Sequence, residues 1–345
     1  MHLPLSEVRA ALSSWLMPVL SSPAEVAWVE QWVGGLPDTF QNVAFECRLG
    51  QTLSRMDVLT CATRAEGREP LSAFLAERHA SSRPLSPAWE RLSALCEEWS
   101  DPASPLHEQL PLIWLEFDNP PEHRSAPPDP FTFLCVQPDY VDRPLVRAPP
   151  DTSWRLVERG LAPLLGRPLS PGLAARVRSC FEALPSRGYV LHAASLESRG
   201  QDAVRLVLTF PAAEIPGYLE RIGWPGPRDE LAALLDAACI GFDTVGFSLD
   251  IGERVQPVFG MECYWFGADP RFLPLFELLI QRGACTPEKR DAAMAWPGRE
   301  RRVLPGDQWP STLDRMLQLK LVYRPGMPLE AKAYLGLSCR FSLFD

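Results

Sequence analysis

The sequence contains no apolar run that approaches the roughly 20 residues a membrane-spanning helix requires. Its first nine residues, Met1–Arg9, lack the basic segment followed by an apolar one that forms a secretion signal. The nine cysteines are odd in number, widely scattered and without a CxxC pair. Unpaired cysteines of this kind are typical of a reducing compartment, where the thiol acts as a small hydrophobe. We therefore expect a cytoplasmic protein that does not contact a membrane.

Positive charge is also scarce. Lysine and arginine number 34 against 43 aspartates and glutamates, which gives a formal net charge of −9. This balance argues against a general nucleic-acid partner or attachment to an anionic membrane. The five histidines show no metal-ligand spacing with the cysteines, and no serine sits in a nucleophile elbow. We therefore expect neither a bound metal nor an organic cofactor.

What the 345 residues do contain is a repeated order of elements. Segments of period-two alternation predict strands, as where Val245, Phe247 and Leu249 alternate with polar or small residues. Serine or threonine followed by proline marks the start of several helices, as at Ser22-Pro23 and Ser86-Pro87. Two helices and a two-stranded hairpin recur five times, so we expect five ααββ units within one domain covering residues 1–345. The units comprise residues 1–61, 68–136, 151–210, 213–266 and 270–345.

Each unit exposes one apolar strand face that it cannot bury alone. Ten antiparallel strands with helices on that face predict an α+β fold in which a barrel-like sheet is ringed by helices. The polar strand faces would then line a lumen. The competing interpretation is an open sheet with its polar face in water. Three proline-rich segments without periodicity are expected to be mobile loops, namely Asn119–Pro130, Pro138–Pro150 and Trp296–Pro310.

Alternation also predicts which side chains face the lumen. Charged residues of both signs and three aromatic residues fall on that face, as expected of a recognition surface. We predict ligand or peptide binding by these residues: Trp114, Glu116, Arg205, Glu262, Tyr264, Lys320, Lys332 and Tyr334. The alternative is that they form structural ion pairs, such as Glu116 or Glu262 with either lysine. His192 lacks an accompanying acid or nucleophile, which favours a structural histidine over a base. No catalytic residue is assigned.

The order of the elements resembles the αββα prenyltransferase barrel, in which basic side chains and tyrosines hold a prenyl diphosphate and an acid on the first strand assists. Glu46 matches the position of that acid, and the resemblance assigns the diphosphate to Arg205, Lys320, Lys332, Tyr264 and Tyr334. However, the strand at 203–210 carries one basic residue where such enzymes carry more, and the strand at 244–250 carries none.

A second resemblance rests on short motifs: Leu112–Asp118, Gly260–Tyr264, Lys320–Tyr323 and Glu330–Leu335. They are similar to the peptide-binding proteins of the crocagin pathway, in which a ribosomally made precursor peptide is modified. The resemblance implies that the chain binds a precursor peptide and assists the tailoring enzymes of the same pathway. A mixed-charge lumen also suits a zwitterionic peptide better than a diphosphate. Our leading hypothesis is therefore a protein that binds the precursor peptide and assists its modification, more as a non-catalytic or assisting binding protein than as an enzyme. The alternatives are an αββα prenyltransferase acting on a peptide or aromatic acceptor, and a small-molecule binding or scaffold protein.

Overall fold

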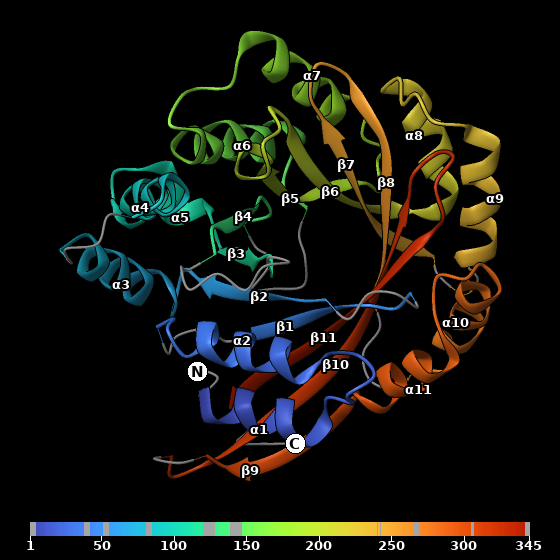
Figure 1. Ribbon diagram of the computed structural model, residues 1–345. Coiled ribbons are helices and arrows are strands. Elements are labelled where there is room, and N and C mark those ends of the chain that lie inside the picture. Colours follow the sequence, from blue (N-terminus) through green and yellow to red (C-terminus); the bar gives the residue numbers. More distant parts are fainter. Residues whose placement is uncertain are drawn as a thin grey trace.

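The computed structural model describes residues 5–37, 42–50, 55–80, 85–119, 128–138, 147–239, 241, 243–264, 269–304 and 307–341. Helix pairs and strand pairs alternate along the chain (Figure 1). The helices are α1 (Leu5–Trp15), α2 (Pro23–Val33), α3 (Arg68–Ala80), α4 (Pro87–Ser100), α5 (Pro105–Gln109), α6 (Pro150–Leu165), α7 (Pro171–Glu182), α8 (Ile215–Arg221), α9 (Arg228–Ala238), α10 (Phe272–Gln281) and α11 (Pro287–Ala295). No helix in the described ranges is long and apolar enough to cross a membrane.

The strands are β1 (Asn42–Arg48), β2 (Met56–Thr63), β3 (Leu112–Phe117), β4 (Pro130–Cys135), β5 (Tyr189–Ser195), β6 (Val204–Pro211), β7 (Thr244–Ile251), β8 (Val255–Tyr264), β9 (Gly298–Val303), β10 (Pro310–Tyr323) and β11 (Glu330–Phe341). Their order is β11-β1-β2-β3-β4-β5-β6-β7-β8-β10-β9, and β11 also pairs with β10. That last pairing closes the first ten into a barrel. All these pairings are antiparallel. The predicted closed barrel is confirmed, and the open sheet is excluded.

Local capping signals account for the helix starts. The Ser22 side chain accepts a hydrogen bond from the backbone of Glu25, and the Glu25 carboxylate accepts one from the backbone of Ser22 at 2.7 Å. The side chains of Ser86 and Thr286 accept backbone hydrogen bonds at the starts of α4 and α11, and each is followed by proline at the first helical position. These caps satisfy amide groups that a helix start otherwise leaves without partners. They lie where the sequence predicts them.

The helices cover the outer face of the barrel, as Figure 1 shows. The apolar half of each strand alternation enters one large core between barrel and helices. That core includes Ile113, Leu115, Phe117, Leu206, Met261, Cys263, Leu319, Leu321, Leu335 and Leu337. The other half of each alternation faces the lumen. The predicted assignment of strand faces is therefore correct for these strands. That residues 1–345 form one domain stays a prediction.

The prediction of an irregular loop over Trp296–Pro310 is wrong. This segment contains β9, which pairs with β10 from Pro310↔Val303 to Arg315↔Gly298. The strand β10 begins seven residues earlier than the predicted start at Leu317. Its early part projects beyond the end of β8, and β9 occupies the resulting place beside it. The sequence did not predict this strand because three of its six residues are arginines. Charged side chains lie on both of its faces, so the apolar–polar alternation of a strand is missing. Most of the other two predicted loops lies outside the described residues.

Candidate functional site

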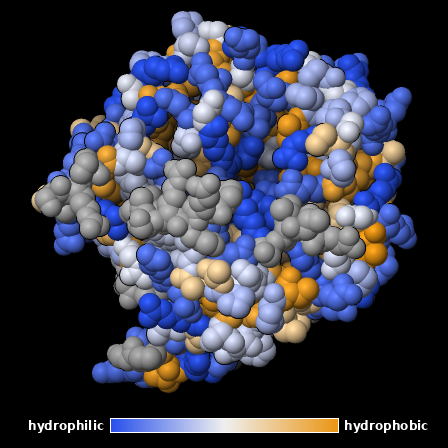
Figure 2. Space-filling view, viewed as in Figure 1, coloured by the Kyte–Doolittle hydropathy of each residue, from blue (hydrophilic) through white to orange (hydrophobic). Residues whose placement is uncertain are grey.

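The hairpin turns β1–β2, β3–β4, β5–β6, β7–β8 and β10–β11 all lie at one end of the barrel, because every strand pair is antiparallel and each turn joins neighbours. Charged side chains line the lumen near this end, and we refer to them as the charged layer. The charged layer consists of Glu46, Arg48, Asp57, Glu116, Asp118, Arg199, Arg205, Asp250, Glu262, Lys320, Glu330 and Lys332. Figure 2 shows hydrophilic atoms gathered in the middle of the face that Figure 1 presents.

Glu46 is a carboxylate of the charged layer that two cations contact. It is 1% exposed, contacts Arg48, and accepts a hydrogen bond from Lys332 Nζ at 3.0 Å. Tyr334 lies directly opposite it on β11. Burial alone would raise the pKa of the Glu46 carboxyl, but Lys332 and Arg48 hold it well below its usual range. Burial and the neighbouring carboxylates, Glu46 first among them, raise the pKa of the Tyr334 phenol well above its usual value. Glu46 is therefore a buried anion held by two cations.

Asp57 lies opposite Glu46 in the β1–β2 ladder and is completely buried. It accepts hydrogen bonds from Arg48 Nη2 at 2.8 Å, from Arg55 Nε at 2.9 Å and from the backbone of Asn119 at 2.7 Å. Burial, followed by the charge of Glu46, raises the pKa of Asp57 to about 6 despite the two arginines. Arg48 thus links two carboxylates that would otherwise repel each other inside a poorly solvated space.

Arg199 reaches the charged layer from the turn between β5 and β6. Its Nη2 donates to Glu116 at 2.8 Å and its Nε donates to Asp118 at 3.1 Å. The same guanidinium lies 3.8 Å from the centre of the Phe131 ring, a cation–π contact. Glu116 and Asp118 together raise the pKa of Arg199 above its usual value against the effect of burial. Arg199 therefore ties the β5–β6 turn across β4 to the end of β3.

The remaining pairs follow directly from strand register. Arg205 and Asp250 are opposite each other on β6 and β7 and form two hydrogen bonds, at 2.7 and 2.9 Å. Lys320 and Glu262 are opposite on β10 and β8, with Lys320 Nζ donating at 2.8 Å. In the part of the lumen that the structure describes, each cation of the charged layer contacts at least one carboxylate within 4 Å. The cations of this layer are thus largely neutralised by the protein itself.

Deeper in the lumen the wall becomes apolar and aromatic. Trp114 packs against two small clusters on the lumen side, which contain Phe131, Phe133, Ala194, Leu196, Ala203, Val207, Cys61, Leu112, Cys135 and Leu191. A register shift between Val190 and His192 marks a bulge in β5. The His192 ring lies 6.4 Å from that of Phe133. Trp114 and His192 are half-buried, so this wall keeps surface that a ligand can cover.

His192 predicts a measurable pH dependence. Burial lowers its pKa from 6.5 to about 4, with Glu262 acting in the opposite direction. The unfolded chain therefore takes up a proton below pH 6.5 while the folded protein does not, so stability falls as the pH drops from 6.5 to 4. At 1.36 kcal/mol per pKa unit this amounts to on the order of 3 kcal/mol. The raised pKa of Asp57 acts in the opposite sense between pH 6 and 3.8.

The effect of His192 must therefore be measured as a difference. Urea denaturation of wild type and His192→Gln at several pH values between 7 and 4 should show wild type losing stability relative to the variant. Parallel curves over this range would show that His192 titrates in the folded protein as it does in the unfolded chain.

Seven of the eight residues predicted from the sequence to bind a ligand are described with their side chains, and they line the lumen. The expected ion pair between Glu262 and Lys320 is present, whereas Lys332 pairs with Glu46 and not with Glu116 or Glu262. The side chain of Tyr264 lies outside the described part. That these residues bind a ligand stays a prediction. Sequence reasoning missed four residues of the charged layer: Arg48, Asp57, Arg199 and Asp250. Strand alternation could have placed Arg48, Asp57 and Asp250 in the lumen. No local pattern places Arg199 there, because it lies in a turn.

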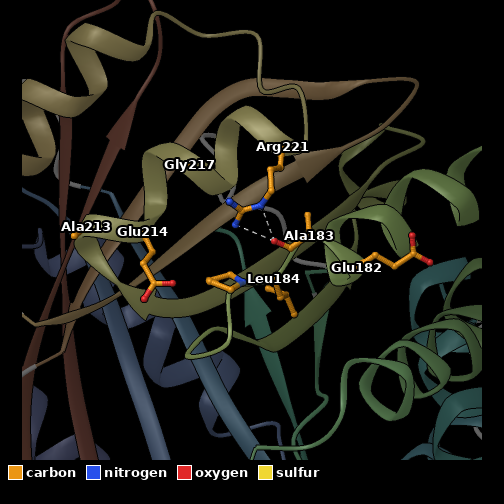
Figure 3. A pocket seen from close by; sticks show the side chains of 8 residues that line it. Glu182, Ala183, Leu184, Ala213, Glu214, Gly217 and Arg221 are labelled. Atoms are coloured by element: carbon orange, nitrogen blue, oxygen red, sulfur yellow. Dashed lines mark hydrogen bonds between the residues drawn. The ribbon is translucent and has the colours of Figure 1, made fainter.

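A separate open pocket of about 450 Å³ lies on the outer helical layer between the end of α7 and α8. Figure 3 shows Arg221 turned toward the backbone of Ala183, to whose carbonyl oxygen it donates hydrogen bonds at 3.2 and 3.1 Å. Glu182 and Glu214 also line the pocket. Because its arginine is occupied and two carboxylates flank it, this pocket has no evident means of holding an anionic ligand.

No protein-family model matches the chain, and no curated protein sequence matches it. Solved structures with similar folds include two prenyl-transferring enzymes. The prenyltransferase PriB in its apo form has a TM-score of 0.56 at 16% identity, covering 97% of this chain and 96% of that one. The 5-dimethylallyltryptophan synthase from Streptomyces coelicolor has a TM-score of 0.53 at 13% identity, covering 97% and 98%. The chain therefore has the fold of the prenyltransferase barrels over nearly its whole length.

Proposed function

We propose that the lumen binds a segment of a ribosomally made precursor peptide and presents it to tailoring enzymes, without transferring a prenyl group itself. The observation that carries this proposal is the charge balance of the charged layer. Arg48, Arg199, Arg205, Lys320 and Lys332 each contact a carboxylate of the protein. A diphosphate needs a surplus of positive charge, and here it would have to displace buried carboxylates from their partners.

A peptide segment suits the same space for two reasons. Its backbone and side chains offer donors, acceptors and charges of both signs, which can exchange with paired groups without leaving a net buried charge. Its apolar or aromatic side chains can cover the half-buried wall around Trp114. The sequence resemblance to precursor-binding proteins supports the same partner.

Prenyl transfer is the second candidate. The barrel fold favours this function. Glu46 favours it as well, because it lies on β1, and the prenyltransferases that the chain resembles carry their assisting acid on the first strand. Against it, β6 contributes Arg205 as its one basic residue and β7 contributes none. Glu46 is moreover bound by two cations, so the carboxylate has little basicity left for taking a proton from an acceptor.

Peptide binding is tested by panning a random peptide library on the protein and measuring the selected peptides by calorimetry. Trp114→Ala should weaken their binding by about 2 kcal/mol, roughly thirty-fold, because it removes the largest aromatic surface of the lumen wall. The control is Leu273→Ala, since Leu273 lies on the outer helix α10 and is 49% exposed. It should leave affinity unchanged. A library that yields no binder weakened by Trp114→Ala would contradict the proposal.

A further inference from the structure

The strand β9 is the one member of the described sheet that lies outside the closed barrel. In the described part of the chain it pairs with β10 along six residues and ends the strand order. Its outer edge thus presents backbone N–H and C=O groups of a preformed strand. Figure 1 shows β9 projecting at the rim of the molecule, beside α1. Such an edge can accept an additional extended chain through main-chain hydrogen bonds.

The two faces of β9 differ in their surroundings. Gly298, Glu300 and Arg302 are half-buried, and Arg302 contacts Glu7 of α1. The neighbouring Arg315 of β10 stacks on the Trp15 ring of α1 at 3.7 Å. Helix α1 therefore holds β9 and β10 in place from this side. Because the edge is already ordered, a partner can bind without the entropic cost of ordering it.

The opposite face of β9 is exposed and basic. Arg299, Arg301 and Val303 are exposed, and Val303 has 56% of its surface accessible. In the ladder Arg299 lies opposite Asp314, which also contacts Arg340 at 3.0 Å. Three arginines thus share this face with one aspartate.

This face also continues the lumen face of β10. Asp314 and Lys320 are six residues apart on one uninterrupted strand, so their side chains point to the same side. The basic face therefore lies beside the lumen opening opposite the hairpin turns.

We propose that β9 is a docking edge for an extended acidic segment of a partner protein, which adds as a further strand. The segment carries acidic residues opposite Arg299 and Arg301 and an apolar residue opposite Val303, next to the exposed Trp309. Charge decides the occupant: a second copy of β9 would set arginines opposite arginines, which is unfavourable, whereas acidic side chains give favourable cross-strand pairs. The three arginines on this face contrast with the net charge of −9 of the whole chain. The inference does not depend on what the lumen binds.

The test uses a fluorescent ten-residue peptide of alternating Glu and Val, with a Lys–Val peptide as its control. Fluorescence anisotropy should show that the full-length protein binds the Glu–Val peptide at least ten-fold more tightly. The double variant R299E/R301E should lose this binding and favour the Lys–Val peptide. The matched control is R167E/R178E, which reverses two exposed arginines outside this face. Arg167 contacts Asp202, and Arg178 contacts Asp151 and Glu182. This variant should bind like wild type.

Hydrogen-exchange mass spectrometry locates the bound peptide. Added Glu–Val peptide should slow exchange in the segment 298–303, and Trp114→Ala should not change this protection. Three results would each overturn the proposal: no binding of the Glu–Val peptide, binding without protection of 298–303, or equal loss in R167E/R178E. If Trp114→Ala keeps the protection of β9, peptide binding at this edge is independent of peptide binding in the lumen. Each of the two proposals can therefore fail without the other.

Discussion

Replacing Glu46 with alanine should lower the free energy of unfolding by about 3–5 kcal/mol, the range measured when one partner of a buried ion pair is removed. Glu46 is almost completely buried and contacts both Arg48 and Lys332. Its removal leaves Lys332 without its 3.0 Å partner and leaves Arg48 with fewer negative charges near it. Tyr334 also loses the carboxylate opposite it. Several polar groups thus become poorly compensated at once.

Equilibrium denaturation of wild type, Glu46→Ala and Glu330→Ala measures this effect. Glu330 contacts some of the same cations, but its side chain is 27% exposed at the end of β11. Its loss should lower stability by about 1 kcal/mol or less, because water screens the pair. If the two variants lose the same free energy of unfolding, burial does not determine how strongly an ion pair of the charged layer stabilises the protein.

The barrel could be predicted because its signals are local and repeated. Period-two alternation assigns Leu319 and Lys320 to opposite faces, and caps such as Ser22 mark helix starts, without any knowledge of distant contacts. Closure could be predicted because an open ten-stranded sheet would have two edge strands with unpaired backbone groups, and a closed barrel has none. The strand β9 could not be predicted, because its partner is the early part of β10, which the sequence did not predict as a strand, and because it also contacts α1, which is distant in the sequence.

For the strand residues of the charged layer, the lumen face was predictable from the sequence but the pairing was not. Alternation places Glu46, Lys320 and Lys332 in the lumen, and register decides which of them meet. Lys332 lies opposite Arg48 on β1, and its side chain reaches the diagonal neighbour Glu46. Arg199 enters the lumen from a turn through contacts with β3, for which the sequence offers no periodic signal.

The fold and the charge of the lumen point in different directions. The barrel is similar to that of prenyltransferases along nearly its whole length. Yet each cation of the charged layer contacts a carboxylate, and burial makes such contacts hard to replace. A diphosphate entering this lumen would meet carboxylates as close to it as the cations. The fold is therefore compatible with prenyl transfer, while the side chains favour a ligand with balanced charge.

Calorimetric titration with dimethylallyl diphosphate tests this account most directly. We expect no binding tighter than about 1 mM, because the described side chains of the lumen offer the diphosphate no surplus of positive charge. Glu262→Gln provides a matched variant: it leaves the side chain nearly the same size but removes the charge paired with Lys320. This variant should bind the diphosphate measurably more tightly than wild type. Micromolar binding by wild type that Lys320→Ala or Arg205→Ala abolishes would contradict the account and establish a diphosphate site in the lumen.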